Sequence, residues 1–142
     1  MESVSAVLGQ IDLDPCADDN KLILALHHYT ILDNGLEQSW YGKVYMNPPY
    51  GRQIESWVWK LKYEYEVNKN TAEAIALLPA RVDTSWWRLL ANYPVCFISG
   101  RLRFSGHNNS APFPSAVVYL GSNVEKFVEV FGKLGKCYIA YK

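Results

Sequence analysis

The sequence has no long hydrophobic run and few of the residues that build disulfide frameworks or metal sites. It contains no stretch of 18 apolar residues and no signal-peptide pattern, so we expect a soluble intracellular protein. The three cysteines (Cys16, Cys96 and Cys137) are odd in number and widely spaced. This fits neither a disulfide framework nor a zinc knuckle and indicates a reducing compartment. Two of the three histidines are adjacent, so we expect no metal site.

The formal net charge of the chain is zero, but its two halves carry net charges of opposite sign. Residues 1–70 carry six Lys/Arg against ten Asp/Glu, a balance of −4, and residues 71–142 carry eight against four, a balance of +4. A neutral protein is a weak candidate for nonspecific nucleic-acid binding. The four arginines of the second half lie within residues 81–103, opposed only by Asp83. A local basic face and ordinary solvated arginines explain this pattern about equally well.

The residues that are present suffice for one folded domain over residues 1–142. Hydrophobic residues make up 49% of the chain, and no linker or repeat interrupts it. The apolar patterns predict strands at residues 10–14, 43–46, 73–78, 95–99, 102–104, 115–120 and 137–141, and helices at residues 18–28, 54–67, 84–91 and 124–134. Strands alternate with helices before the tail becomes rich in strands. This predicts an α/β sheet, parallel in its first part, with helices on both faces.

Polar or proline-rich dipeptides follow three of the expected strands. These dipeptides are Asp14-Pro15, Asn47-Pro48 and Pro79-Ala80. Ligands of open α/β sheets bind at the carboxyl ends of the strands. We therefore expect one site in which these three segments meet.

The most informative motif is Asn47-Pro48-Pro49-Tyr50, which lies between an apolar strand and Gly51. Proline cannot continue a sheet ladder, so the strand ends here, and the fixed φ angles make the turn stiff. The side-chain carbonyl of Asn47 and the backbone carbonyl of Pro48 can accept two hydrogen bonds from one amino group. Tyr50 offers an aromatic face for stacking. An ordinary proline-rich turn is the alternative, but the preceding Asn and the flanking strand and helix favour a site for a flat amino-bearing group.

Six stretches, in uninterrupted order over about residues 10–120, give the chain a family resemblance. They are Ile11-Asp12-Leu13-Asp14-Pro15-Cys16-Ala17, Asp33-Asn34-Gly35-Leu36 with Trp40 and Gly42, Asn47-Pro48-Pro49-Tyr50-Gly51, Leu77-Leu78-Pro79-Ala80-Arg81-Val82-Asp83-Thr84, Gly100-Arg101-Leu102-Arg103-Phe104 and Ala111-Pro112-Phe113-Pro114-Ser115-Ala116. Together they resemble the phage and prophage family of DNA N6-adenine methyltransferases, the Dam-like group. The Asn-Pro-Pro-Tyr motif alone is shared with RNA and protein-glutamine methyltransferases, whereas the last three stretches are more specific.

The resemblance implies a Rossmann-like fold, S-adenosylmethionine as methyl donor and methylation of a flipped adenine in double-stranded DNA. It implies an enzyme encoded by a phage or prophage and acting in the cytoplasm of a bacterial host cell, without a membrane or metal requirement. The implied catalytic residues are Asn47, Pro48, Pro49 and Tyr50. The first three of these form the turn, in which two acceptors would polarise the adenine amino group toward attack on the methyl sulfonium by proximity and orientation.

Binding residues are also expected outside the catalytic motif, those for the cofactor from the resemblance and those for DNA from their charge, polarity and position. Those for the cofactor are Asp14, Pro15, Cys16, Ala17 and Asp33. Those for DNA are Arg81, Arg101, Arg103, His107, Asn108 and Asn109. The arginines would hold phosphates, and the polar loop at residues 105–114 would read bases or phosphates. A strand-end cap for Asp14, a turn residue for Asp33 and a plain hairpin loop for residues 105–114 are the alternatives.

Two features depart from the family pattern. No glycine-rich loop follows Asp14, and only ten residues precede Ile11, too few for the Thr-Pro segment that closes over the cofactor in relatives. The resemblance therefore implies either an upstream start or an N-terminally shortened fold that binds its cofactor weakly. A noncatalytic DNA-binding relative and a methyltransferase acting on RNA or protein glutamine remain alternatives, although the basic C-terminal half favours nucleic acid.

Overall fold

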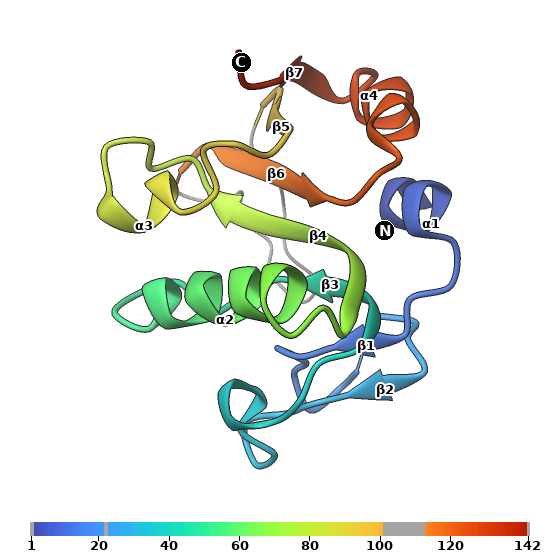
Figure 1. The fold of residues 1–142 in the computed structure, drawn as a ribbon, viewed down its shortest axis with the longest axis vertical. Coiled ribbons are helices and arrows are strands. Elements are labelled where there is room, and N and C mark those ends of the chain that lie inside the picture. The colour runs from blue at the N-terminus through green and yellow to red at the C-terminus, as the bar shows by residue number, and fades with distance from the viewer. Residues whose placement is uncertain (1, 22, 101–112, 142) are drawn as a thin grey trace.

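A mixed β-sheet with helices on both faces forms the centre of the molecule (Figure 1). The structure is a computed structural model that describes residues 2–21, 23–100 and 113–141. In this part of the chain the sheet has seven strands in the order β2-β1-β3-β4-β6-β5-β7. The strands are β1 (Leu13–Asp14), β2 (His27–His28), β3 (Gly42–Met46), β4 (Thr71–Pro79), β5 (Val95–Ile98), β6 (Ser115–Leu120) and β7 (Gly135–Tyr138).

Strand direction divides the sheet at β4. Strands β2, β1, β3 and β4 run parallel, whereas β6 is antiparallel to both β4 and β5, and β7 is antiparallel to β5. The expectation of a sheet that is parallel in its first part is confirmed. The helices are α1 (Glu2–Leu8), α2 (Ile54–Glu66), α3 (Ser85–Arg88) and α4 (Val124–Phe131), with a 3-10 turn η1 (Gly35–Glu37).

Helices α2 and α3 cover one face of the sheet, and α1 and α4 pack together on the other (Figure 1). The alternation of side chains along β4 shows why both faces need cover. Ala74, Ala76 and Leu78 belong to the core beneath α2 and α3, while Ile75 and Leu77 belong to the core beneath α1 and α4. A strand buried on both faces is therefore apolar at successive positions, as parallel and central strands usually are.

Helix α2 follows the expected amphipathic pattern. Its buried residues include Ile54, Trp57, Val58 and Leu61, spaced at three and four positions so that they lie on one face. Full burial of each such side chain stabilises the fold by roughly 1.5–3 kcal/mol. The helix starts four residues after Tyr50, so its packing fixes the motif that precedes it.

The prediction of a helix at residues 18–28 is wrong. The segment makes a turn in which the N–H of Lys21 donates to Asp18, and it ends in β2. The N–H groups of Leu26 and His27 donate to carbonyls of residues 11 and 12, so the backbone extends along β1. Leu26 is 61% exposed, which shows that the apolar spacing did not mark a buried helical face.

Other boundaries differ by a few residues. Strand β1 is shorter than residues 10–14, α3 is shorter than residues 84–91, and α4 ends at Phe131. Strand β7 starts at Gly135 and ends at Tyr138 rather than covering residues 137–141. The strand expected at residues 102–104 lies outside the described residues. Helix α1 was not expected from the sequence.

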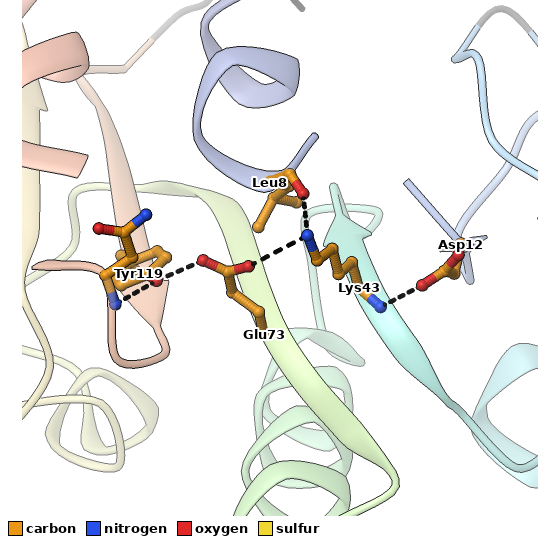
Figure 2. A network of polar contacts seen from close by, with 6 residues as sticks. Leu8, Asp12, Lys43, Glu73 and Tyr119 are labelled. Atoms are coloured by element: carbon orange, nitrogen blue, oxygen red, sulfur yellow. Dashed lines mark hydrogen bonds and ion pairs between the residues drawn. The ribbon is translucent and has the colours of Figure 1, made fainter. Parts of the chain in front are cut away.

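A polar network joins elements where β3 and β4 begin (Figure 2). The Nζ atom of Lys43 lies 2.6 Å from the carbonyl oxygen of Leu8 and 3.9 Å from a carboxylate oxygen of Glu73. The hydroxyl of Tyr119 donates to the other Glu73 oxygen and accepts a hydrogen bond from the N–H of Asn123 at 2.9 Å. This network fastens α1, β3, β4 and β6 together.

Asp12 extends the network toward β1 (Figure 2). Its Oδ2 atom accepts the N–H of Lys43 at 2.8 Å. The preceding Gly42 has φ +65, and an added Cβ would lie 2.2 Å from the same Asp12 oxygen. Only glycine fits this close approach without displacing the carboxylate.

Candidate active site

The order of the strands reverses at β1, so the carboxyl end of this strand lies at the point of reversal. The chain leaves β1 to form β2 on one side and then returns to form β3 on the other (Figure 1). In open α/β sheets this reversal is where ligands bind. Because β1, β3 and β4 are parallel neighbours, the segments Asp14-Pro15, Asn47-Pro48 and Pro79-Ala80 lie at one edge. The expectation that the three segments lie at one edge of the sheet is confirmed, and their forming one site stays a prediction.

Asp14 is a buried carboxylic acid at this edge. Its side chain follows β1 and the residue is only 3% exposed. Burial raises its pKa to about 6, an effect partly offset by the N–H of Cys16 and by His28. The Cys16 nitrogen lies 3.3 Å from the Asp14 Oδ1 atom. Asp14 therefore changes charge near neutral pH, and its carboxylate can accept hydrogen bonds from a ligand hydroxyl or amino group.

The loop after β1 contacts the turn after β3. Burial, and next Asp14, raise the pKa of the Cys16 thiol well above its usual value, whereas the backbone N–H of Asn47 lowers it. The Cys16 sulfur thus lies against the start of the Asn-Pro-Pro-Tyr turn. The N–H of Ala17 donates to the carbonyl of Tyr29 at 2.9 Å, which holds the loop against the chain that leaves β2.

The turn at Gly35 packs directly on the loop after β1. A Cβ added to Gly35 would lie 2.3 Å from the carbonyl oxygen of Pro15 and 3.1 Å from the Trp57 ring. The indole N–H of Trp40 donates to the Gly35 carbonyl at 2.8 Å and fixes this position from the core. Glycine is needed here because the two backbones approach closely.

Asp33, two residues earlier, is exposed and caps the turn. Its Oδ2 atom accepts the N–H of Thr30 at 2.9 Å and the Thr30 hydroxyl at 3.2 Å. The contacts are those of a turn residue, which was the alternative to a cofactor ligand. Its part in cofactor binding stays a prediction.

The Asn-Pro-Pro-Tyr turn follows β3 at this edge of the sheet. Asn47 is half-buried, Pro48 is buried and Pro49 is exposed. Among the residues that the structure describes, none hydrogen-bonds to the Asn47 side-chain amide. The turn itself is held by β3 on one side and α2 on the other.

Tyr50, Phe113 and Arg81 form a row beside this turn. The rings of Tyr50 and Phe113 meet edge to face, with centroids 4.7 Å apart at 67°. The Arg81 guanidinium lies 5.8 Å from the Phe113 ring centroid. Burial raises the pKa of the Tyr50 phenol to about 12, so it stays protonated. An aromatic surface thus ends in a cation, as suits a base and its phosphate.

The other predicted DNA-binding residues, Arg101, Arg103, His107, Asn108 and Asn109, lie outside the described residues. Sequence reasoning missed Phe113 as a site residue, although the stretch around it was part of the resemblance. Burial, with smaller effects of Tyr50, Asp14 and Cys16, raises the pKa of the Tyr45 phenol, which packs in the core beneath α1 and α4.

Comparison with known families decides the class of the protein. The sequence model of the family described as DNA N-6-adenine-methyltransferase (Dam) matches residues 1–120. The chain belongs to this family. It is therefore an enzyme of the DNA adenine methyltransferase class, and the fold is that of S-adenosylmethionine-dependent methyltransferases. No match was found among curated proteins.

The Dam match covers the segments that follow β1, β3 and β4 and the row beside them. Strands β1 to β6 lie within the matched residues, whereas α4 and β7 follow them. Family membership implies the use of S-adenosylmethionine and a DNA substrate. Within the described residues, no helix is both long and apolar enough to cross a membrane, and no three His, Cys, Asp or Glu side chains gather as metal ligands would.

Proposed function

We propose that the protein transfers a methyl group from S-adenosylmethionine to N6 of an adenine in double-stranded DNA, at the carboxyl ends of β1 and β3. The position of Asn47 beside the strand-order reversal, inside a Dam family match, carries the proposal, and its side-chain amide has no hydrogen-bond partner among the described residues. The bound cofactor supplies an electrophilic methyl group on its sulfonium. The chain's residues orient the acceptor amine and hold the cofactor.

Asn47 and Pro48 act on the amino group of the base. The Asn47 side-chain carbonyl and the Pro48 backbone carbonyl accept its two hydrogens, which localises the nitrogen lone pair. Since both acceptors are part of a stiff turn, little reorganisation is needed when the base arrives. Tyr50 stacks on the base after it leaves the duplex. Phe113 supports the Tyr50 ring from its edge and holds Arg81 above its own face.

Asp14 and the loop to Ala17 fit the cofactor. A buried carboxylate with a pKa near 6 is ionised at neutral pH and can accept hydrogen bonds from ribose hydroxyls. The loop backbone of Pro15, Cys16 and Ala17 lies at the same edge of the sheet. Asp33 lies beyond it and would reach the cofactor only by releasing Thr30.

The test is transfer of labelled methyl from S-adenosylmethionine to duplex DNA, with the product digested to nucleosides. We expect label in N6-methyladenine. RNA of the same sequence and a glutamine-containing peptide are offered in parallel. Label that appears only in RNA or peptide, or DNA binding with no transfer to any acceptor, would overturn the proposal.

A further inference from the structure

Two cysteines that are far apart in the sequence face each other across strands β5 and β7. The strand register pairs Cys96 directly with Cys137. Both belong to the sheet face beneath α1 and α4, where Cys96 is fully buried and Cys137 packs against the same core. Two thiols on one face at paired positions are placed as a cross-strand disulfide requires.

The hydrogen bonds of the ladder define how close the two backbones are. The N–H of Ser99 donates to the carbonyl of Leu134 at 2.9 Å, and these residues are opposite each other one step beyond Ile98 and Gly135. Hydrogen-bonded and non-hydrogen-bonded pairs alternate along an antiparallel ladder. Three steps back, Cys96 and Cys137 form a non-hydrogen-bonded pair, whose Cα atoms lie about 4.5 Å apart. Disulfides span Cα separations of about 4.4–6.8 Å.

The surroundings distinguish the two thiols. The Cys96 sulfur lies 3.3 Å from the Phe131 carbonyl, and burial, with a further effect of the adjacent Cys137, raises the pKa of its thiol to about 12. Cys137 is only half-buried and belongs to β7, the outermost strand on its side of the sheet. Cys137 is therefore the thiol that an external reagent reaches first.

We propose that Cys96 and Cys137 are a reversible dithiol–disulfide pair that, when oxidised, ties the edge strand β7 to the sheet. The oxidant is a small disulfide such as oxidised glutathione. The Cys137 thiol loses its proton and attacks one sulfur of that disulfide, forming a mixed disulfide and releasing one small thiol. The Cys96 sulfur then displaces the second small thiol from Cys137. The protein loses two hydrogen atoms, and the reagent is reduced to two thiols.

Oxidation closes a loop that contains β6 and α4. Loops of this length lower the entropy of the unfolded chain substantially, and for a domain of this size we expect the melting temperature to rise by roughly 5–15 °C. In reducing compartments such pairs are transient and respond to oxidants. The pair is separate from the methyl-transfer site, where Cys16 lies, and Cys137 is outside the part matched by the Dam family.

The experiment uses the full chain equilibrated with oxidised or reduced glutathione. Free thiols are blocked, and peptides are mapped by mass spectrometry without reduction. We expect a linked pair of peptides containing Cys96 and Cys137, a free Cys16, and a higher melting temperature that returns to the starting value after reduction. Cys16→Ser should keep the link, and Cys137→Ser, a mild change at a half-buried edge position, should abolish both the link and the shift.

A stable glutathione adduct on Cys137, a link that includes Cys16, or crosslinked dimers in place of the internal link would each overturn the proposal. So would a Cys96–Cys137 link that leaves the melting temperature unchanged. Peptide mapping of the parent protein decides the pairing even where a variant folds poorly.

Discussion

The polar residues at the two ends of the parallel strands differ in how many partners they have among the described residues. Where β3 and β4 begin, Lys43, Glu73 and Tyr119 bind one another and nearby backbone groups (Figure 2). Where β1 and β3 end, Asp14 and Asn47 have few partners among the residues that the structure describes. Polar groups that satisfy one another stabilise a fold, whereas polar groups that are held rigidly but left open can bind a ligand.

Two buried carboxylates show the same contrast. Glu64 is 1% exposed and accepts the backbone N–H of Trp40 at 2.9 Å and the amide of Asn68 at 2.7 Å, with Lys60 at 3.6 Å. Asp14 is 3% exposed and accepts one N–H at 3.3 Å. Burial alone therefore does not mark a site. The two carboxylates differ in the number of partners that the described residues provide, and this difference is the reason for proposing Asp14, and not Glu64, as a ligand-binding acid.

The largest effect should come from Asn47→Ala. Removing the acceptor for the adenine amino group should slow methyl transfer by roughly 100-fold or more, as for loss of one preorganised transition-state hydrogen bond. Cofactor affinity and melting temperature should stay close to those of the parent, because the side chain is bound to nothing else that the structure describes. Asn92→Ala, at an exposed turn before β5, is the matched control. Transfer by Asn47→Ala at the parent rate would refute the assigned role.

A substitution in the polar network where β3 and β4 begin should change the stability of the protein and leave its activity unchanged. Tyr119→Phe keeps the ring stacked on Phe127 but removes the hydroxyl that bonds Glu73 and the N–H of Asn123. We expect the free energy of unfolding in urea to fall by about 1–3 kcal/mol, because buried polar groups lose their partner. Methyl transfer per folded molecule should be unchanged. Tyr63→Phe, on the exposed side of α2, is the control and should alter neither stability nor activity. If Tyr119→Phe lost activity with unaltered stability, the network would belong to the functional site and not to the stabilising part of the fold.

A smaller effect is expected from the titration of Asp14. In the proposed function, the Asp14 carboxylate accepts hydrogen bonds from the cofactor only when ionised, so affinity should rise as pH increases through about 6. At pH 5 about one tenth of the groups are ionised, and cofactor binding measured by calorimetry should be up to roughly tenfold weaker than at pH 7. Asp14→Asn should make affinity almost independent of pH in this range.

The stability of the free protein should change with pH in the opposite direction. The pKa of Asp14 is raised from 3.8 to about 6 on folding, so the native state binds more protons than the unfolded state between these values. Unfolding free energy should therefore fall as pH rises through this window, and Asp14→Asn should remove that part of the decline. A cofactor affinity that falls with rising pH would contradict the role given to Asp14.

The smallest effect should come from Arg81→Gln. If Arg81 contacts one phosphate, its loss should reduce the magnitude of the slope of log K against log salt by roughly 0.9 and weaken DNA binding modestly. Lys69→Gln removes the same charge from an exposed residue before β4, at the opposite end of the strands, and should leave the slope unchanged. If the slope of log K against log salt is the same for Arg81→Gln and Lys69→Gln, Arg81 is an ordinary surface cation.

The site edge could be predicted from the sequence because its signals are local. Asn47 and Asp14 directly follow apolar strands, and the direction of parallel strands places such residues together. The contacts that complete the site are not local. Phe113 reaches Tyr50 from more than 60 positions away in the sequence, and nothing in its neighbours indicates this partner. A turn role for Asp33 could be weighed from the sequence, but the packing of the nearby Gly35 against the Pro15 carbonyl depends on three-dimensional fit.

The errors in the predicted elements have the same origin. The apolar spacing within residues 18–28 suggests a helix, but the edge of β1 offers backbone partners that an isolated segment lacks. Conversely, α1 has only seven residues and is stabilised by the packing of Val4, Val7 and Leu8 beneath α4. So short a helix depends on tertiary contacts rather than on its own propensity.

Strand β4 also bears on how the chain folds as it is synthesised. One edge of β4 pairs with β3, which precedes it, but the other pairs with β6, which emerges only after α3, β5 and residues 101–112. Until then an apolar strand has a free row of backbone N–H and C=O groups. Such an edge is a template for pairing with other nascent chains. Slow translation before residue 115 should therefore favour aggregation, and a chaperone that shields extended apolar segments should improve the yield of folded protein.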